Sequence, residues 1–137
     1  MKTKVRCFED LIAWQNAMDL AVEVYAMTDD GPLVRDFPLR DQMHRAAISV
    51  PSNIAEGFER GSRSEFHRFL SIAKGSCAEL RTQLMLAQRI GYVDEARVLS
   101  TLQRAEGTAR IIGRLRTTVA RQRLTPLMPH PPCPMPE

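Results

Sequence analysis

The chain has 137 residues, of which 44% are hydrophobic, 26% are charged and only 6% are aromatic, and its formal net charge is +3. This length and composition suit a single helical domain better than a β-sandwich. No segment approaches the ~20 consecutive apolar residues of a membrane span, and the N-terminus lacks the apolar region of a signal peptide. We therefore expect an all-α cytoplasmic protein with no membrane partner.

The first predicted helix covers residues 11–27 and carries two adjacent apolar stripes at helical spacing. One stripe is Leu11, Trp14, Met18, Ala21 and Tyr25, and the other is Ala13, Ala17, Leu20, Val24 and Met27. Only a narrow polar strip remains, so we expect this helix to be covered on more than one side. The segment TDDGP at residues 28–32 predicts the turn that ends it.

The second predicted helix begins near residues 36–39 and runs to about Arg60. Pro51 lies inside it. Proline lacks an N–H group and its ring collides with the carbonyl four residues back, here that of Ala47, at a cost of ~3 kcal/mol in a helix interior. We therefore expect a kink at Pro51, or a break that divides the helix.

A turn at residues 61–64 separates the second and third predicted helices. Gly61 is expected to cap the second helix, and the sequence S-x-x-E at 62–65 predicts a capping box. The third helix, residues 64–90, has an unbroken pattern typical of a bundle seam, formed by Phe66, Leu70, Ala73, Cys77, Leu80, Leu84 and Ala87. Gly91 is expected to end it.

Asp94 is expected to cap a fourth helix, whose apolar face is formed by Val98, Leu102, Ala105, Ala109, Ile112 and Val119. After Leu124 the chain becomes proline-rich, which prevents a helix and predicts a flexible tail. The predicted architecture is an antiparallel up-down four-helix bundle over residues 1–124, with a kinked second helix and a disordered tail over 125–137.

Catalytic and metal-binding patterns are poorly represented. His44 and His67 have no second His or Cys at the spacing of a helical metal site, and His130 and Cys133 lie three apart but are separated by prolines. Residues 75–77, G-S-C, fall inside a predicted helix rather than in the strand-to-helix turn of a hydrolase nucleophile, so we favour close helix packing there. We expect no enzymatic activity, no cofactor and no metal site.

A line of polar residues follows one face of the second helix at steps of three or four: Arg45, Ser49, Asn53, Glu56 and Arg60. Glu56 and Arg60 are spaced for an ion pair. Two interpretations remain open. The line is either a solvated face or a polar seam at a helix or subunit interface, because its neighbours are small: Ala46, Ala47, Ser52, Ala55 and Gly57.

Charge is unevenly distributed along the chain. Residues 97–123 contain seven arginines and one glutamate, whereas residues 1–30 contain three basic and six acidic residues. One interpretation is pairing between an acidic first helix and a basic fourth helix. The other is an outward stripe of Arg110, Arg114 and Arg121, which lie within ~40° of one another opposite the apolar face.

An exposed arginine stripe of this kind suits the phosphate backbone of nucleic acid. We predict a nucleic-acid interface formed by Arg104, Arg110, Arg114 and Arg121. The stripe has no interleaved aromatic residues for base stacking.

Several segments of the chain match the pattern of a known family: F-E-D-L-I-A-W-Q-N-A at 8–17, L-R-D-Q-M at 39–43, R-A-A-x-S at 45–49, S-N-I-A-E-G-F-E-R at 52–60 and E-F-x-x-F-L-x-I-A-K-G-S-C-x-E-L-R at 65–81. Together they resemble the four helix bundle protein family, whose members are encoded by intervening sequences in bacterial large-subunit ribosomal RNA genes. The resemblance covers roughly residues 8–93.

The resemblance implies a long antiparallel four-helix bundle that assembles into a ring-like homopentamer without known enzymatic activity. Similar accessory proteins of diversity-generating retroelements bind nucleic acid and a reverse transcriptase. The family pattern implies packing or assembly roles for Arg45, Ser49, Asn53, Glu56, Gly57, Arg60, Gly75, Ser76 and Glu79.

From the residues and the resemblance together, we expect a homo-oligomer that binds RNA or DNA through basic helix faces, as an accessory of a reverse transcriptase or another nucleoprotein component. The alternative is a structural or protein-interaction scaffold that does not bind nucleic acid.

Overall fold

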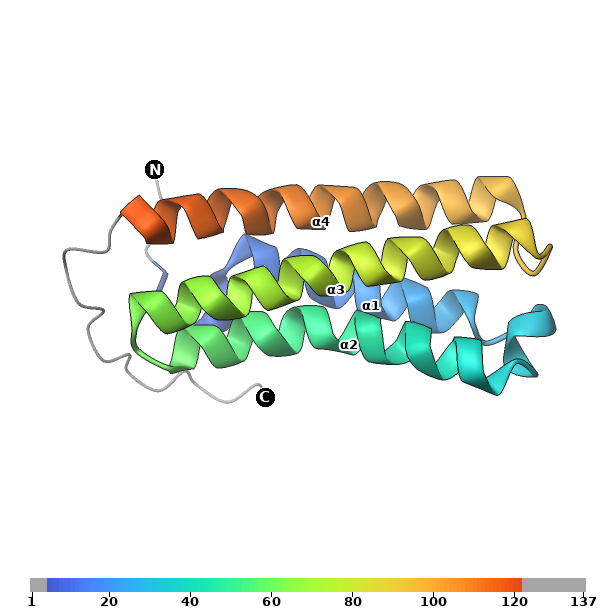
Figure 1. Cartoon of the computed structure of the whole chain (residues 1–137), viewed down its shortest axis with the longest axis horizontal. Helices are drawn as coiled ribbons and strands as arrows, with labels where there is room; N and C mark the ends of the chain where they lie inside the picture. Colours follow the sequence, from blue (N-terminus) through green and yellow to red (C-terminus); the bar gives the residue numbers. More distant parts are fainter. Residues whose placement is uncertain (1–4, 122–137) are drawn as a thin grey trace.

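The computed structural model describes residues 5–121, which form four long helices lying side by side (Figure 1). These are α1 (Ile12–Met27), α2 (Phe37–Glu59), α3 (Arg63–Arg89) and α4 (Glu95–Arg121), with short 3-10 helices at Phe8–Asp10 and Gly31–Val34. No strand occurs among residues 5–121, so the all-α prediction is confirmed. The predicted tail, 125–137, lies outside the described residues.

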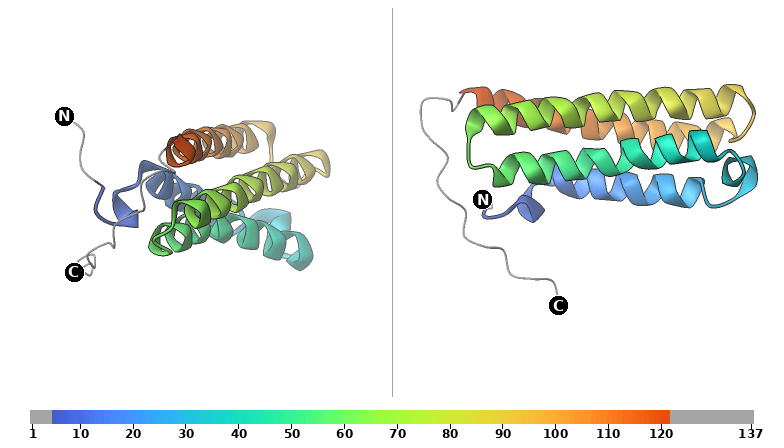
Figure 2. Two further views of the ribbon diagram at one scale, coloured as in Figure 1. Left: turned by 60° about the vertical axis from the view of Figure 1, so that its left-hand side comes forward. Right: turned by 60° about the horizontal axis from the view of Figure 1, so that its bottom comes forward.

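The helices contact one another in the cyclic order α1, α2, α3, α4, as expected for an antiparallel up-down bundle. The pair α3–α4 lies on one side of the molecule and the pair α1–α2 on the other (Figure 2). α1 has 16 residues, against 27 each in α3 and α4, and it packs less extensively on its neighbours than α3 does. The predicted bundle architecture is therefore confirmed.

The core is formed by the apolar face of each helix. The predicted seam of α3 is buried along its whole length, from Phe66 to Ala87. In α1 only the second of the two predicted stripes is fully buried, namely Ala13, Ala17, Leu20, Val24 and Met27. The first stripe includes Met18 and Tyr25, whose side chains are 39% and 44% exposed. One side of α1 is thus not covered by the other described residues, 5–121.

α2 continues through Pro51 as one helix, so the predicted break is wrong. The local cost of the missing N–H group is offset by packing, because Val50, Pro51 and Ile54 are all buried between neighbouring helices. The milder alternative, a kink, stays a prediction.

The helix ends follow the predicted chemistry. The Asp36 carboxylate accepts a hydrogen bond from the Leu39 amide at the start of α2, at 3.2 Å. Gly61 and Gly91 adopt φ values of 71° and 84°, which other residues avoid. Ser62 Oγ accepts from the Glu65 amide at 3.4 Å, which is one half of the predicted capping box, while the Glu65 carboxylate pairs with Arg68 at 3.4 Å.

Candidate nucleic-acid interface

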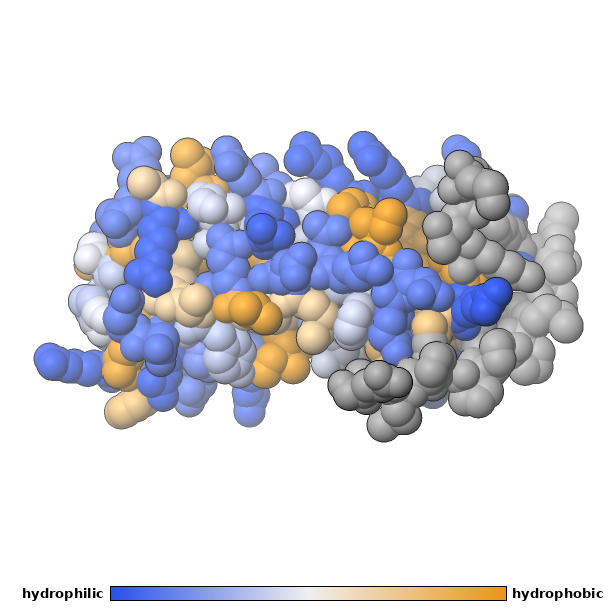
Figure 3. Space-filling model, turned by 180° about the vertical axis from the view of Figure 1, so that it is seen from behind, coloured by the Kyte–Doolittle hydropathy of each residue, from blue (hydrophilic) through white to orange (hydrophobic). Residues whose placement is uncertain are grey.

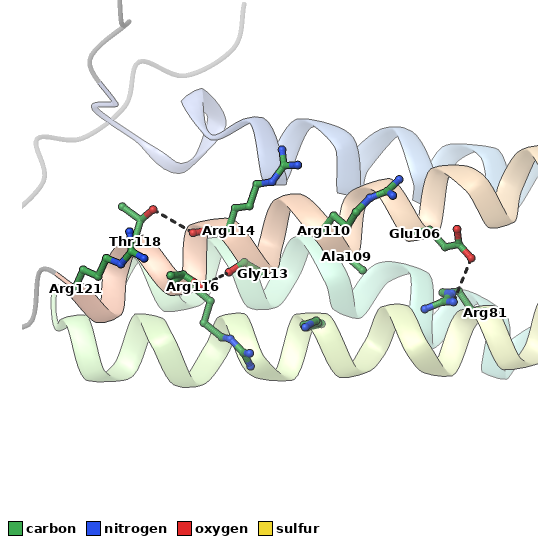
Figure 4. Close-up of a pocket in the computed structure, with 11 residues that line it drawn as sticks. Arg81, Glu106, Ala109, Arg110, Gly113, Arg114, Arg116, Thr118 and Arg121 are labelled. Atoms are coloured by element: carbon green, nitrogen blue, oxygen red, sulfur yellow. Dashed lines mark hydrogen bonds and ion pairs between the residues drawn. The ribbon is translucent and has the colours of Figure 1, made fainter.

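A groove with a volume of about 760 Å³ runs between α3 and α4. We call it the basic groove, because six cationic side chains line it against a single carboxylate, that of Glu106: Lys74, Arg81, Arg110, Arg114, Arg116 and Arg121. Small residues of α4, among them Ala109 and Gly113, leave the space between the two helices open. In Figure 4, Arg116 extends from α4 toward α3, whereas Arg110 and Arg114 extend away from α3.

The cations of the basic groove fall into two rows. Arg110 and Arg114 extend to one side of α4, whereas Arg116 extends toward α3 and donates to Ser71 Oγ at 3.3 Å (Figure 4). On the α3 side lie Lys74 and Arg81. Cations therefore lie along both of the helices that border the groove.

Most of these cations have no anionic partner. Within residues 5–121, no carboxylate forms an ion pair with Lys74, Arg110, Arg114 or Arg121. Arg81 is the exception, since it pairs with Glu106 at 3.2 Å at one end of the groove. The groove thus concentrates positive charge that the carboxylates of residues 5–121 do not neutralise.

Arg104 lies elsewhere. Its guanidinium pairs with Glu23 and lies 3.9 Å from Asp19, both on α1. Arg97 likewise pairs with Asp30, at 3.0 Å. Both sequence interpretations of the charge pattern therefore hold in part: the first half of α4 pairs with acidic groups of the N-terminal region, and only the second half presents unpaired arginines.

Two members of the polar line, Ser49 and Asn53, form a hydrogen-bond chain with Ser76 of α3. Asn53 Nδ2 donates to Ser49 Oγ at 2.8 Å, and Ser49 Oγ lies 2.8 Å from Ser76 Oγ. Ser76 Oγ donates to the Ile72 carbonyl at 3.1 Å, which leaves Ser49 as the donor to Ser76. This part of the line is a polar seam between helices of one chain.

The remaining residues of the polar line face solvent. Arg45, Glu56 and Arg60 are exposed, and Glu56 pairs with Arg60 at 3.0 Å at the predicted helical spacing. Glu79 of α3 is also exposed and accepts a hydrogen bond from Gln83 at 3.3 Å. These residues therefore lie on a solvated face, where Arg60 also places its guanidinium over the ring of Phe69 on α3, 5.1 Å from the ring centroid.

The two glycines of the family pattern differ in their surroundings. A Cβ atom on Gly57 would lie 2.5 Å from Phe69 Cβ, so α2 and α3 can approach this closely only without a side chain here. A Cβ on Gly75 would have no described atom within 4 Å. The close packing that we expected at Gly75 is therefore absent within the part of the chain that the structure describes.

The environment of Cys77 makes it a poor nucleophile. Cys77 is fully buried, and burial raises the pKa of its thiol to about 11, an effect that the nearby Arg81 opposes only in part. A thiol in this state is protonated and poorly nucleophilic. Among the described residues, no group of three or more His, Cys, Asp or Glu side chains could hold a metal ion.

A second groove, of about 510 Å³, lies between α1 and α2. We call it the apolar groove, because almost all of its lining is apolar: Trp14, Met18, Ala21, Val22, Tyr25, Ile48, Pro51, Ser52 and Ala55. It contains most of the stripe of α1 that the chain leaves uncovered, and Figure 3 shows apolar patches on this back face of the bundle. The sequence signalled it through the doubled stripe of the first helix and the small residues of the second.

Sequence reasoning missed three members of the basic groove, Lys74, Arg81 and Arg116. Lys74 lies on α3, and its Nζ comes within 3.8 Å of the position that a Cβ on Gly113 would occupy. A helical wheel of α4 alone cannot reveal this neighbour, because the contact depends on how α3 and α4 pack.

Comparison with known proteins agrees with this architecture. No curated protein matches the chain. Among solved structures, the fold is similar to that of a protein of unknown function from the S23 ribosomal protein family of Bacteroides thetaiotaomicron, with a TM-score of 0.70 and 20% sequence identity. The similarity covers 77% of this chain and 98% of that one.

The helices of residues 5–121 include none that combines the length and the apolarity needed to cross a membrane. The family model of the 23S rRNA-intervening sequence proteins matches residues 9–114, which include all of α1, α2 and α3 and most of α4. The chain therefore belongs to the 23S rRNA-intervening sequence protein family.

Proposed function

We propose that this protein is a non-enzymatic, cytoplasmic homo-oligomer, a pentamer as the family resemblance implies, that binds RNA or DNA through the basic groove as an accessory of a nucleoprotein complex. The observation that carries the proposal is the set of unpaired cations in that groove: Lys74, Arg110, Arg114 and Arg121.

Phosphate groups are the natural partners of such a set. A guanidinium group donates two parallel hydrogen bonds to a phosphate, and binding releases counterions from the nucleic acid. The paired arginines of α4 show the contrast, because Arg97 and Arg104 already have carboxylates within the chain. In the basic groove, by contrast, an external polyanion can form ion pairs with cations that have no carboxylate partner within residues 5–121.

The apolar groove supports the oligomeric part of the proposal. Val22 on α1 is 67% exposed and Ile48 on α2 is 46% exposed, although both are large apolar residues. Contiguous exposed apolar surface of this kind is typical of interaction sites. We infer that a second copy of the chain covers it, in agreement with the ring-like assembly that the family resemblance implies.

Binding can be measured by fluorescence anisotropy with labelled RNA and DNA while the salt concentration is raised from about 50 to about 200 mM. The variant Arg110→Gln/Arg114→Gln should bind more weakly, and the dependence of log K on log salt should become shallower by about two, because each phosphate contact contributes about 0.9.

The matched control is Arg35→Gln/Arg89→Gln, which removes the same charge from two exposed arginines outside the basic groove. It should retain the affinity and salt dependence of the wild type. Equal losses in both variants would show a nonspecific effect of net charge. No binding by the wild type, together with normal assembly, would favour the alternative of a scaffold, which the apolar groove alone supports.

A further inference from the structure

The cations of the basic groove are arranged around a trough. Arg110, Arg114 and Arg121 form one row along α4. Lys74 and Arg81 form the other row on α3. The rows are carried by two helices that pack directly on each other, with axes roughly 8–10 Å apart, so cations of both helices can reach a single phosphodiester backbone that lies along the trough. From residue 110 to residue 121 the α4 row extends about 16 Å, enough for several phosphates.

The floor of the trough contains small residues of α4, and Arg116 crosses it toward α3, where it donates to Ser71 Oγ at 3.3 Å. Ala109 and Gly113 lie between the rows, and the atoms nearest to a Cβ on Gly113 would be those of the Lys74 side chain, at 3.8 Å and 4.0 Å. A backbone can therefore approach α4 closely at this point. The Thr117 hydroxyl, also in the lining, donates to the Gly113 carbonyl at 3.0 Å, so its oxygen remains an acceptor.

No aromatic side chain lines the trough. The aromatic residues with described contacts pair with one another or with groups elsewhere, as Phe8 does with Trp14 and Phe58 with Phe66. Proteins that hold single strands generally stack the unpaired bases on aromatic rings. The trough therefore provides cations for the phosphates of a strand but no aromatic ring on which its bases could stack.

Resting on the proposed function, we propose that the basic groove takes one strand of a nucleic-acid duplex, backbone first, with the bases turned away and paired to the complementary strand. A duplex satisfies this geometry because its bases are already stacked and hydrogen-bonded, and its phosphates are held at fixed spacing. Recognition is then independent of base sequence, since phosphate contacts carry no sequence information.

The test compares RNA and DNA duplexes of about 20 base pairs, two helical turns, with their separated strands at equal phosphate concentration. Both duplexes should bind at least about tenfold more tightly than the single strands, whose bases gain no stacking partner in the groove. Equal affinity for RNA and DNA assigns binding to the phosphate backbone alone, and a preference for RNA assigns a contribution to the 2′-hydroxyl.

A charge-neutral variant tests the trough itself. Gly113→Leu should weaken duplex binding about tenfold by filling the floor, whereas Gly107→Leu changes a glycine of α4 that lies outside the groove and has open space around it. The control should bind like the wild type. Circular dichroism verifies that both variants retain their helices.

Single strands that bind as tightly as duplexes would contradict the inference that the trough binds one strand of a duplex, and so would unchanged affinity of the Gly113→Leu variant. Neither result would contradict nucleic-acid binding as such. Absence of binding to all four probes would instead overturn the proposed function and this inference together.

Discussion

Gly57 and Gly75 are both helical glycines, but they differ in what a side chain would meet. At Gly57 the nearest atom is Phe69 Cβ, which is bonded to the backbone and cannot rotate away. At Gly75 a methyl group enters open space. The first glycine is required by the approach of α2 to α3, and the second is not required by anything in the described chain.

Replacing Gly57 and Gly75 with alanine should therefore change the free energy of unfolding in opposite directions. Gly57→Ala should lower the free energy of unfolding by about 1–3 kcal/mol, because α2 and α3 must separate. Gly75→Ala should raise it by about 0.5–1 kcal/mol, because alanine restricts the unfolded chain more than glycine does. Urea denaturation at one fixed protein concentration measures both. A destabilising Gly75→Ala would place Gly75 in a contact between subunits, as the family resemblance implies.

His44 joins the C-terminal end of α1 to α2. Its ring stacks on that of Tyr25 with centroids 3.9 Å apart, and Nε2 lies 2.7 Å from Thr28 Oγ1. Burial, and secondarily the charge of Arg40, lower the pKa of His44 below 6.5, while Asp41 opposes the shift. The folded protein thus favours the neutral ring more strongly than the unfolded chain does.

The sign of the pH dependence follows. Below pH 6.5 the unfolded chain binds a proton at this site more readily than the folded protein, so the stability due to His44 falls as the pH drops toward its folded pKa. Between about pH 7.5 and about pH 5, the melting temperature of the wild type should fall more than that of His44→Gln. Parallel curves for the two proteins, recorded by circular dichroism, would contradict this assignment.

At the scale of single elements, the helices and their ends could be predicted from the sequence, because periodicity and capping are local. Gly61, Ser62 and Gly91 lie where their chemistry places the ends of α2 and α3. The effect of Pro51 could not be predicted, because a local cost of ~3 kcal/mol competes with the burial of Val50 and Ile54, which depends on neighbouring helices.

The candidate site could be predicted only where it lies on one helix. Arg110, Arg114 and Arg121 share a face of α4, which a helical wheel reveals. The partner of Arg104, in contrast, is Glu23, 81 positions earlier in the chain. The total charge of each segment indicates that pairing occurs, but only the packing of α1 against α4 decides which arginines are neutralised.

On the scale of the whole molecule, the two grooves lie on opposite sides of the bundle. The apolar groove belongs to the α1–α2 pair and the basic groove to the α3–α4 pair, which are separated by the core (Figure 2). A second subunit can therefore cover the apolar groove of a chain without covering the basic groove of that same chain. Assembly then multiplies the number of basic grooves that one nucleic acid can contact at the same time.

Association and nucleic-acid binding can be separated with one pair of variants. Val22→Glu places a charge in the apolar groove, and Leu99→Glu changes an apolar residue of α4 that is 51% exposed and lies outside both grooves. In light scattering coupled to gel filtration, the wild type and Leu99→Glu should form the oligomer, whereas Val22→Glu should be a monomer. A monomeric wild type would contradict the oligomer outright.

The same two variants then show how assembly affects binding. A monomer contacts phosphates through one basic groove, whereas an oligomer engages several on a long duplex and releases more counterions. Val22→Glu should therefore bind long duplexes more weakly than Leu99→Glu and with a shallower salt dependence, although both variants gain one negative charge and keep all six cations of the basic groove. On a duplex too short to reach a second groove, the difference between them should disappear, because each oligomer then engages it as a monomer does. A difference that persists on the short duplex would mean that the apolar groove itself contributes to the interface with nucleic acid.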